Sequence, residues 1–368
     1  MSTSPQPSSL SVPTGTADSQ LPIAARFDRL DIVLTPKDLG DGSDSVLNPG
    51  CVRLPDGTLQ VYPRVLSPGN ISRIGSYRAR EGADAALRLE AYGYALVPEA
   101  PYELRHEPGG YGCEDPRLTY IPAIACYVMA YVAFGPGGPE IALAASSDGL
   151  RWQRLGLLRF ADNDAPFADK DAAFFPEPVR SPGGIMSLAF YHRPTLPLSV
   201  RDGQRAARLL GTLPPEQHEG ISIGYVSLDA VRSDLSNLCS VVETHRLELP
   251  PASWGNIKVG AGTPPVRIDE GWLSVIHGVD ELEHPSGAAL LRYCAGIIVH
   301  DPEHLHRVLF RSQAPLFVPT IPGEIVGTVG YVVFPTGIDP RPDIGRRVFD
   351  IYYGMADYAI GRGRLTLA

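Results

Sequence analysis

The sequence predicts an all-β protein, and specifically a five-bladed β-propeller whose blades are four-stranded antiparallel sheets. Three observations predict this fold: the glycine and proline content, a fivefold repeat, and alternating apolar segments that follow turn sequences. Gly (38) and Pro (36) make up about a fifth of the 368 residues, and neither is favourable inside helices. Because 44% of the residues are hydrophobic, the chain can still bury a large core, so many short strands joined by turns are expected.

The repeat is clearest in a series of X-Pro steps, each of which opens a short apolar run. The prolines of successive steps are separated by 67, 60, 88 and 71 residues. The five steps are Asn48-Pro49, Asp115-Pro116, Phe175-Pro176, Thr263-Pro264 and Phe334-Pro335. A second series, of acidic residues at turns, interleaves with the first once per repeat. Five such units with a period of about 70 residues suggest a five-bladed propeller. A linear solenoid is the alternative, but its repeats are usually shorter.

Turn sequences inside the repeats lead into strands. Asp56-Gly57, Gly183-Gly184 and Glu270-Gly271 each precede a segment in which apolar and polar residues alternate. This period of two is the period of a β-strand, and such turn sequences favour hairpins. Each repeat is therefore expected to contain about four hairpin-linked strands.

We expect residues 26–368 to form a single domain. In it, the C-terminal strands share a blade with N-terminal strands and so close the ring. Residues 1–25 are rich in Ser, Thr, Pro and Gln and are predicted to be a disordered tail. No interior linker is expected, and residues 162–170 and 198–218 should form long loops on one face. The strand that opens each repeat would be innermost, so Asn48, Asp115, Glu177, Thr263 and Phe334 should surround one funnel.

Composition excludes several classes of protein. The net charge of −9 disfavours nucleic-acid binding, and no segment has the apolar length of a membrane helix. The N-terminus lacks the features of a signal peptide. The five cysteines show no CxxC spacing, and no ligand pair has zinc-site spacing, so we expect reduced core thiols, no metal and a cytoplasmic location.

The densest motif contains two adjacent carboxylates, Glu114 and Asp115, followed by Arg117. Because successive strand residues point to opposite faces, only one carboxylate should face the funnel, and the other should pair with Arg117 or cap a turn. A buried carboxyl here fits the general acid of an inverting glycosyl transfer. The alternative is a turn carboxylate that is satisfied by backbone N–H groups.

Cations recur at comparable places in separate repeats, near strand ends. Arg73, Lys170, Arg193 and Lys258 would converge on an anion, and phosphate is the obvious small one. The alternative is four unrelated surface ion pairs. Aromatic and polar residues fit a sugar, because a pyranose has an apolar face and polar edges. Those residues are Tyr111, Trp254, Tyr293 and Phe334, with His277 and Asp357 as partners for hydroxyl groups, although each of these types, taken alone, is more often structural.

The chain resembles the enzymes of glycoside hydrolase family 130, the β-mannoside phosphorylases and their hydrolytic relatives. The matching segments run in family order over almost the whole chain after residue 26. They are 112–119 (GCEDPRLT), 175–178 with 192–194, 258–264 (KVGAGTP) with 271–273, 277–278 and 352–357 (YYGMAD). The resemblance implies a five-bladed propeller, in agreement with the repeat count.

The resemblance also implies roles. Asp115 matches the general acid, which protonates the leaving oxygen through the 3-hydroxyl of the mannose. The phosphate ligands match Arg73, Lys170, His192, Arg193 and Lys258. The donor sugar would meet Tyr293 and Asp357, with Asn48, Tyr111, Glu177, His277 and Phe334 completing the predicted sugar site. Inorganic phosphate is then a co-substrate that converts a β-mannoside into α-mannose 1-phosphate with inversion, and neither a metal nor an organic cofactor is needed.

Two departures from the family pattern keep alternatives open. Asp171 lies beside Lys170 where phosphorylases often have a neutral amide, and a carboxylate there would repel phosphate unless it pairs with Lys170. The first blade reads Tyr62-Pro63-Arg64, where relatives usually have an unbroken strand. Hydrolysis by an inverting β-mannosidase, with Glu177 as the base, is therefore the second hypothesis. A non-catalytic propeller that binds glycans or proteins is the third. The long loops could also mediate a homo-oligomer.

Overall fold

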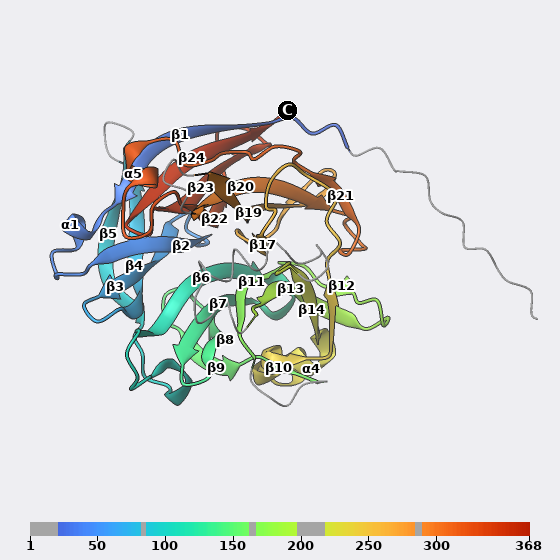
Figure 1. Ribbon diagram of the computed structural model, residues 1–368. Coiled ribbons are helices and arrows are strands. Elements are labelled where there is room, and N and C mark those ends of the chain that lie inside the picture. The colour runs from blue at the N-terminus through green and yellow to red at the C-terminus, as the bar shows by residue number, and fades with distance from the viewer. Residues whose placement is uncertain (1–20, 82–85, 162–166, 197–217, 284–288) are drawn as a thin grey trace, which may run out of the picture.

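The computed structural model describes residues 21–81, 86–161, 167–196, 218–283 and 289–368, and this part of the chain is mostly β-sheet (Figure 1). Residues 1–20 of the predicted tail 1–25 lie outside the described residues, and so do 162–166 and 197–217, which include most of the predicted loops 162–170 and 198–218. Residues 21–25 were also assigned to the tail, but Leu21 donates a backbone hydrogen bond to Leu309 and Ala25 already begins the first strand. The sheet domain thus starts a few residues before the predicted boundary.

The first two repeats form one hydrogen-bonded sheet of eight strands. In the order of the chain these strands are β2 (Ser45–Arg53), β3 (Leu59–Ser67), β4 (Ile71–Glu81), β5 (Leu87–Leu96), β6 (Tyr111–Ile121), β7 (Cys126–Gly135), β8 (Gly138–Ser146) and β9 (Gln153–Leu157). Strands β2 to β5 pair in sequence and antiparallel, and so do β6 to β9. A short parallel pairing of β4 with β6 joins the two groups. Gly57, with φ 83°, makes the predicted turn into β3.

The next two repeats form two separate sheets. One contains β11 (Asp169–Phe174), β12 (Val179–Arg180), β13 (Met186–Pro194), β14 (Ser222–Ser227) and β16 (Glu243–Arg246). The other contains β17 (Lys258–Ala261), β18 (Val266–Ile268), β19 (Gly271–Glu283), β20 (Ala289–His300) and β21 (Val308–Arg311). Strand β19 begins at Gly271 of the predicted turn Glu270-Gly271, and β13 begins two residues after the predicted turn Gly183-Gly184. Two short strands, β10 (Arg159–Phe160) and β15 (Ser240–Val241), pair in parallel beside them.

The last sheet combines the two ends of the described chain. Its strands are β22 (Val333–Pro340), β23 (Val348–Met355), β24 (Ala359–Leu367) and β1 (Ala25–Leu34). Strand β1 pairs antiparallel with β24, from Ala25 opposite Leu367 to Leu34 opposite Ile360. The predicted pairing of N-terminal with C-terminal strands is therefore confirmed.

Helices are few and short. The α-helices of the described residues are α1 (Pro36–Leu39), α4 (Leu228–Ser233) and α5 (Pro322–Ile325), and 3₁₀ turns cover Pro101–Glu103, Pro122–Ile124 and Leu235–Cys239. None of these helices has the length and apolar character that a membrane crossing requires. All five cysteines are buried and free, as predicted. The prediction of an all-β protein is confirmed.

The core consists of apolar clusters that each join two neighbouring strand groups. Tyr62 of β3 packs in one cluster with Met129 of β7, and Val128 of β7 in the next with Ala172 of β11. The clusters continue with β11 and β19, then with β19 and β23, and finally with β2 and β23. The groups therefore bury their apolar faces against one another, from the first to the fifth and back to the first.

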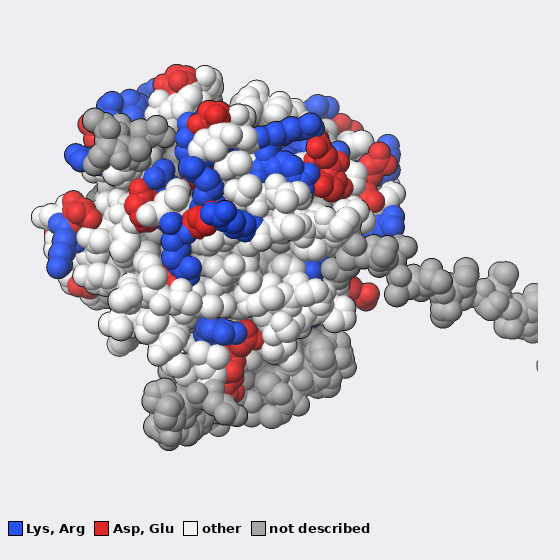
Figure 2. Space-filling model, turned by 90° about the horizontal axis from the view of Figure 1, so that it is seen from above, with Lys and Arg blue, Asp and Glu red and all other residues white. Residues whose placement is uncertain are grey.

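The face over β1 and β24 carries Lys and Arg side chains next to Asp and Glu side chains (Figure 2). Ion pairs on the surface include Arg346 with Asp269 and Arg347 with Glu270, the latter at 2.8 Å. The first pair is largely exposed and adds little stability, because water already solvates both charges, whereas Arg347 and Glu270 are half-buried. Many surface charges of the molecule therefore compensate one another locally.

Candidate active site

A cavity of about 330 Å³ collects residues from the first strand of every group. The strands β2, β6, β11, β17 and β22 contribute Asn48, Asp115, Lys170 with Asp171, Lys258 and Phe334. Neighbouring strands and turns supply the rest of the wall: Arg64, Phe134, Pro139, Arg193, Thr195, His277, Tyr293, Val329, Val332 and Asp357. The expectation that the opening strands of the repeats meet at one site agrees with this lining.

Backbone bulges turn three of these side chains into the cavity. Asn48, Asp115 and Asp171 have φ values of 44°, 46° and 62°, and each lies at a register shift between its strand and the next one. Two residues there oppose one on the partner strand, which is a β-bulge. Asn and Asp are among the few residues that adopt this left-handed conformation without large strain. The residue type at these positions is therefore set by the backbone as well as by the chemistry.

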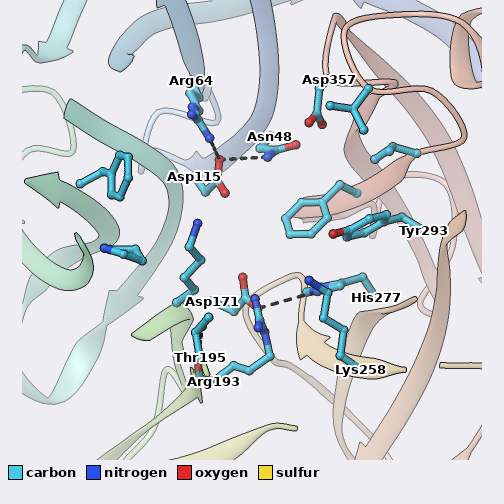
Figure 3. A pocket seen from close by; sticks show the side chains of 16 residues that line it. Asn48, Arg64, Asp115, Asp171, Arg193, Thr195, Lys258, His277, Tyr293 and Asp357 are labelled. Atoms are coloured by element: carbon cyan, nitrogen blue, oxygen red, sulfur yellow. Dashed lines mark hydrogen bonds and ion pairs between the residues drawn. The ribbon is translucent and has the colours of Figure 1, made fainter. Parts of the chain in front are cut away.

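Asp115 is held through one of its two carboxylate oxygens. Its Oδ1 accepts hydrogen bonds from Asn48 Nδ2 at 2.9 Å and from Arg64 Nη1 at 3.2 Å (Figure 3). Burial acts to raise the pKa of Asp115, but the charges of Arg64, Arg117 and Lys170 and the Asn48 hydrogen bond outweigh burial and lower this pKa. Neither of the hydrogen bonds engages Oδ2, so that oxygen is the one that can exchange a proton with a ligand.

Glu114, the second carboxylate of the motif, points to a different set of partners. It accepts a hydrogen bond from Arg64 Nη2 at 2.7 Å, and its Oε2 lies 3.8 Å from Lys170 Nζ. As predicted, only one of the adjacent carboxylates lines the cavity. The predicted pairing of the other with Arg117 is wrong, because Arg117 donates to Asp171 at 3.2 Å instead.

Asp171 is neutralised by arginines rather than by Lys170. Arg193 Nε donates to its Oδ2 at 2.6 Å and Arg117 Nη2 to its Oδ1 at 3.2 Å. Burial acts to raise the pKa of Asp171, but Arg193, His277 and Arg117 together bring this pKa below its usual value. A carboxylate compensated by two guanidinium groups repels an incoming anion far less than a lone one does.

His277 is buried, and within the described residues neither of its ring nitrogens has a hydrogen-bond partner. Its Nε2 lies 3.7 Å from Asp171 Oδ2. Gly260 leaves room for this approach, because a Cβ there would lie 2.3 Å from the imidazole. Burial lowers the pKa of His277 to about 3, and nearby arginines and Lys258 act in the same direction, so the ring is neutral at pH 7. A neutral imidazole with unpaired nitrogens can both donate to and accept from a bound ligand.

Two ammonium groups remain for an anionic ligand. Arg193 is already shared between Asp171 and Glu219. Lys258 forms no ion pair with a described carboxylate, and its Nζ lies 5.4 Å from the centre of the Tyr293 ring. Among the described carboxylates, Lys170 forms an ion pair with Glu114 alone, at the long distance of 3.8 Å. These lysines can turn toward a phosphate without breaking a short ion pair.

Asp357 faces Asp115 and Arg64 from the turn between β23 and β24 (Figure 3). Burial, followed by the charges of Asp115 and Glu114, raises the pKa of Asp357 from 3.8 to about 6, although Arg64 and Lys170 oppose this rise. The folded protein thus keeps a proton on Asp357 at pH values where the unfolded chain has lost it.

This shift predicts a pH-dependent effect of Asp357→Asn. Because the folded pKa is raised, the contribution of Asp357 to stability is present below pH 4 and is lost as the pH rises to about 6. Relative to the wild type, the variant should gain about 2 kcal/mol in unfolding free energy between pH 4 and pH 7. Urea unfolding at both pH values measures the gain, and parallel pH profiles for the two proteins would contradict the prediction.

Six of the residues predicted at the site do not line the cavity. One of them, Trp254, is buried in the core and donates a hydrogen bond from its Nε1 to Ser312 O at 2.8 Å. Arg73 lies over the ring of Tyr94, at 4.4 Å, and donates to Ser67. His192 bonds to Asp169 at 2.8 Å and to Thr244 at 2.7 Å, and it lines a separate cavity with Phe160 and Phe167. Glu177 is exposed in the turn after β11, and Tyr111 lies at the start of β6 without reaching the cavity. Thr263 lies in the β17–β18 connection and is buried, bonded to Ser274 and Val275.

The physical reasons for these corrections are local. In the third repeat the bulge falls at Asp171-Ala172, without a proline, so the X-Pro step at Phe175-Pro176 marks the end of the strand instead. On the first pair of strands, Arg64 of β3 reaches the cavity in place of Arg73 of β4. The departure noted at Tyr62-Pro63-Arg64 was the available signal for Arg64. The sequence carried no signal for Thr195, Phe134, Pro139, Val329 and Val332.

Metal ligation has no candidate here. In the ranges that the structure describes, no group of three or more His, Cys, Asp and Glu side chains is arranged to hold a metal ion. The polar groups of the cavity are instead carboxylates interleaved with arginines and lysines. This arrangement suits an uncharged polyol together with a small anion.

Comparison with known proteins points to one family. A family model described as beta-1,4-mannooligosaccharide phosphorylase matches residues 230–367. A 1,2-beta-oligomannan phosphorylase of Thermoanaerobacter sp. (strain X514) is 27% identical over 79% of this chain and 77% of its own length. A beta-1,2-mannobiose phosphorylase of Listeria innocua is 28% identical over 78% of this chain and 64% of its own length.

The fold is shared as well. The structure of beta-1,2-mannobiose phosphorylase from Listeria innocua in complex with β-1,2-mannobiose aligns with a TM-score of 0.68 at 20% identity, over 92% of this chain and 96% of that one. A further structure, from work on GH130 enzymes that include glycoside hydrolases for β-1,2 mannosidic linkages, aligns with a TM-score of 0.64 at 18% identity, over 92% and 93% of the two chains. In sequence and in fold the chain is thus similar to the β-mannoside phosphorylases of glycoside hydrolase family 130.

Proposed function

We propose that this protein is an inverting phosphorylase of short β-mannosides that releases α-mannose 1-phosphate. The single observation that carries the proposal is the division of the cavity. Asp115 is held by Asn48 and Arg64 at one side, whereas at another side Arg193 binds Asp171 and Lys258 lies beside His277 (Figure 3). Lys170, whose Nζ lies 3.8 Å from Glu114 Oε2, also lines the cavity. Inversion requires this separation, because the nucleophile and the acid act on opposite faces of the sugar. The phosphorylase names of the relatives support the choice of substrate.

In the proposed reaction, an oxygen of inorganic phosphate attacks C1 of the mannose while the bond from C1 to the leaving oxygen breaks. Asp115 supplies the proton that the leaving oxygen takes up, and the family resemblance routes this proton through the 3-hydroxyl of the mannose. The lysines hold the phosphate in line and screen it from the carboxylates. No metal or organic cofactor enters this scheme.

The lowered pKa of Asp115 is compatible with a general acid that becomes protonated when its co-substrate, phosphate, is bound. Lys170 is one of the charges that lower this pKa. A phosphate dianion bound at Lys170 would offset that charge and raise the pKa of Asp115. Phosphate binding would therefore prepare the acid for proton transfer, which suits an enzyme that must not react with water alone.

Hydrolysis, the second hypothesis, is disfavoured by two findings. Glu177, the base it requires, is exposed outside the cavity, and Asp171 is compensated by Arg193 and Arg117. An arginine-compensated carboxylate is a weak base. Asp171 therefore gives no reason to suspect that the phosphate site has been lost.

The proposed site requires one domain of five blades. Two observations support this arrangement: the apolar clusters run from the first strand group around to the fifth and back, and β2 contacts both β6 and β22. Five strand groups that are joined in succession by five apolar clusters would form a closed ring. We propose that the described residues form this single propeller.

Phosphate dependence is the test of the proposed function. Purified protein is incubated with β-1,2- and β-1,4-mannobiose, with and without inorganic phosphate, and the products are followed by NMR. We expect α-mannose 1-phosphate only when phosphate is present. Free mannose formed equally in both conditions would show a hydrolase instead, and the arsenate-dependent release of mannose would confirm that the anion site accepts a tetrahedral oxyanion.

A further inference from the structure

The loop between α5 and β22, residues 326–332, places an apolar side chain at the mouth of the cavity. Val329 lines the cavity and is nevertheless 47% exposed, whereas the other lining residues are buried or half-buried. Val332 of the same loop lines the cavity deeper, at 3% exposure. A branched aliphatic side chain therefore stands where a ligand would enter a cavity rich in charge.

The backbone of this loop is fixed, so the exposure of Val329 does not result from a loose segment. Val329 N donates to Ala356 O at 3.1 Å, and Thr328 Oγ1 lies 2.9 Å from Ser45 Oγ. Gly327 packs so closely on the adjacent turn that a Cβ there would lie 2.3 Å from Ala356 O. These contacts tie the loop to the turn that carries Asp357.

The start of the loop is anchored by a buried charge. Glu324 of α5 is fully buried and accepts hydrogen bonds from Arg29 of β1 at 2.7 and 2.8 Å and from Tyr353 at 3.0 Å. A buried carboxylate paired this way is costly to displace. The loop consequently presents Val329 in one position, as a preformed part of the wall.

The depth of the charged groups decides which part of a ligand meets Val329. Asp115, Asp171, Arg193 and His277 are all 7% exposed or less, so the phosphate and the reacting sugar must lie deep. The leaving group departs toward solvent and therefore occupies the most exposed part of the cavity. The aliphatic side chain there cannot form hydrogen bonds, but it can pack on the C–H face of a pyranose or on an aromatic ring.

We infer that Val329 forms the apolar contact surface for the leaving group, so that this subsite recognises the C–H face of a sugar or an aryl aglycone rather than a pattern of hydroxyl groups. The inference rests on the proposed function. A contact without directional hydrogen bonds discriminates weakly between ligands of similar shape, since rejection is strong only where a buried polar group is left unpaired. The subsite should thus tolerate several leaving-group sugars.

The test compares Val329→Thr with Val326→Thr. Threonine keeps the shape of valine and replaces one methyl by a hydroxyl, which removes apolar contact without opening a hole. Val326 is the matched control, because it lies in the same loop, is 73% exposed and does not line the cavity. Initial rates are measured with β-1,2-mannobiose, β-1,4-mannobiose and 4-nitrophenyl β-mannoside at saturating phosphate, and again with phosphate varied.

We expect Val329→Thr to raise the KM for the mannosides about 5- to 10-fold and to leave the KM for phosphate unchanged. Val326→Thr should match the wild type. If Val329→Thr also matches an active wild type, or changes only the KM for phosphate, the inference is wrong and the proposed function stands. If the wild type turns over none of these substrates with phosphate, the proposed function fails and the inference fails with it.

Discussion

Replacement of Asp115 by Asn is expected to lower kcat for phosphorolysis about 10³-fold while the protein remains folded. The substitution removes the only proton that the proposed acid can supply, yet it preserves the size of the side chain. Asn also tolerates the φ of 46° at this position and can keep a hydrogen bond from Arg64 to its amide oxygen. The loss should therefore come from chemistry and not from folding, which thermal unfolding of the variant verifies.

A substrate that does not need an acid provides the control. The leaving group of 2,4-dinitrophenyl β-mannoside departs without protonation, so Asp115→Asn should process it with phosphate at a rate close to that of the wild type. Equal losses on this substrate and on mannobiose would contradict the acid role. If the wild type binds mannosides without turnover and the variant binds them equally well, the protein is the non-catalytic propeller of the third hypothesis.

Replacement of Arg193 by Met is expected to have the largest effect on stability, a decrease of about 3 kcal/mol in the free energy of unfolding. Arg193 and Asp171 are almost fully buried, and Arg193 also pairs with buried Glu219. Its removal leaves two carboxylates short of a positive partner, and the cost of a buried uncompensated charge exceeds that of lost packing. Phosphate binding should weaken at the same time, because the repulsion from Asp171 reappears.

The double variant Arg193→Met with Asp171→Asn separates the two causes. Removing the uncompensated carboxylate should recover part of the lost stability, whereas simple loss of packing would leave the two effects additive. Arg346→Met is the matched control, since Arg346 pairs with Asp269 on the surface, where both side chains are largely exposed. Urea unfolding should find that control close to the wild type.

Much of the fold could be predicted from the sequence because glycine-containing turns mark where strands of the repeat begin. Gly57, with φ 83°, and Gly184, with φ 86°, occupy conformations that side chains disfavour, and hairpins follow them as expected. The pairing of β1 with β24 followed from the need to complete the last sheet. The exact start of the domain could not be predicted, because no turn residue marks it.

The candidate site was predictable where a bulge and a proline coincide. Asn48-Pro49 and Asp115-Pro116 indicated side chains that do line the cavity. In the third repeat the same bulge lacks a proline, so the rule selected Glu177 over Asp171. His192 failed for another reason: alternate strand residues face opposite sides, and His192, next to Arg193, therefore faces away from the cavity. Arg64 lines the cavity and Arg73 does not, because their side chains point in different directions from neighbouring strands. No local sequence pattern predicts these directions.

The pairing of β1 with β24 also has a consequence for synthesis on the ribosome. The residues of β1 are made more than 300 residues before their partners, Ile360 to Leu367. Until then, the edge of β1 that β24 will cover has its N–H and C=O groups unpaired, and such an edge invites association with other chains. The last sheet can therefore form only after β24 has left the ribosome, and during that interval the unpaired edge of β1 is a site where misassembly can begin.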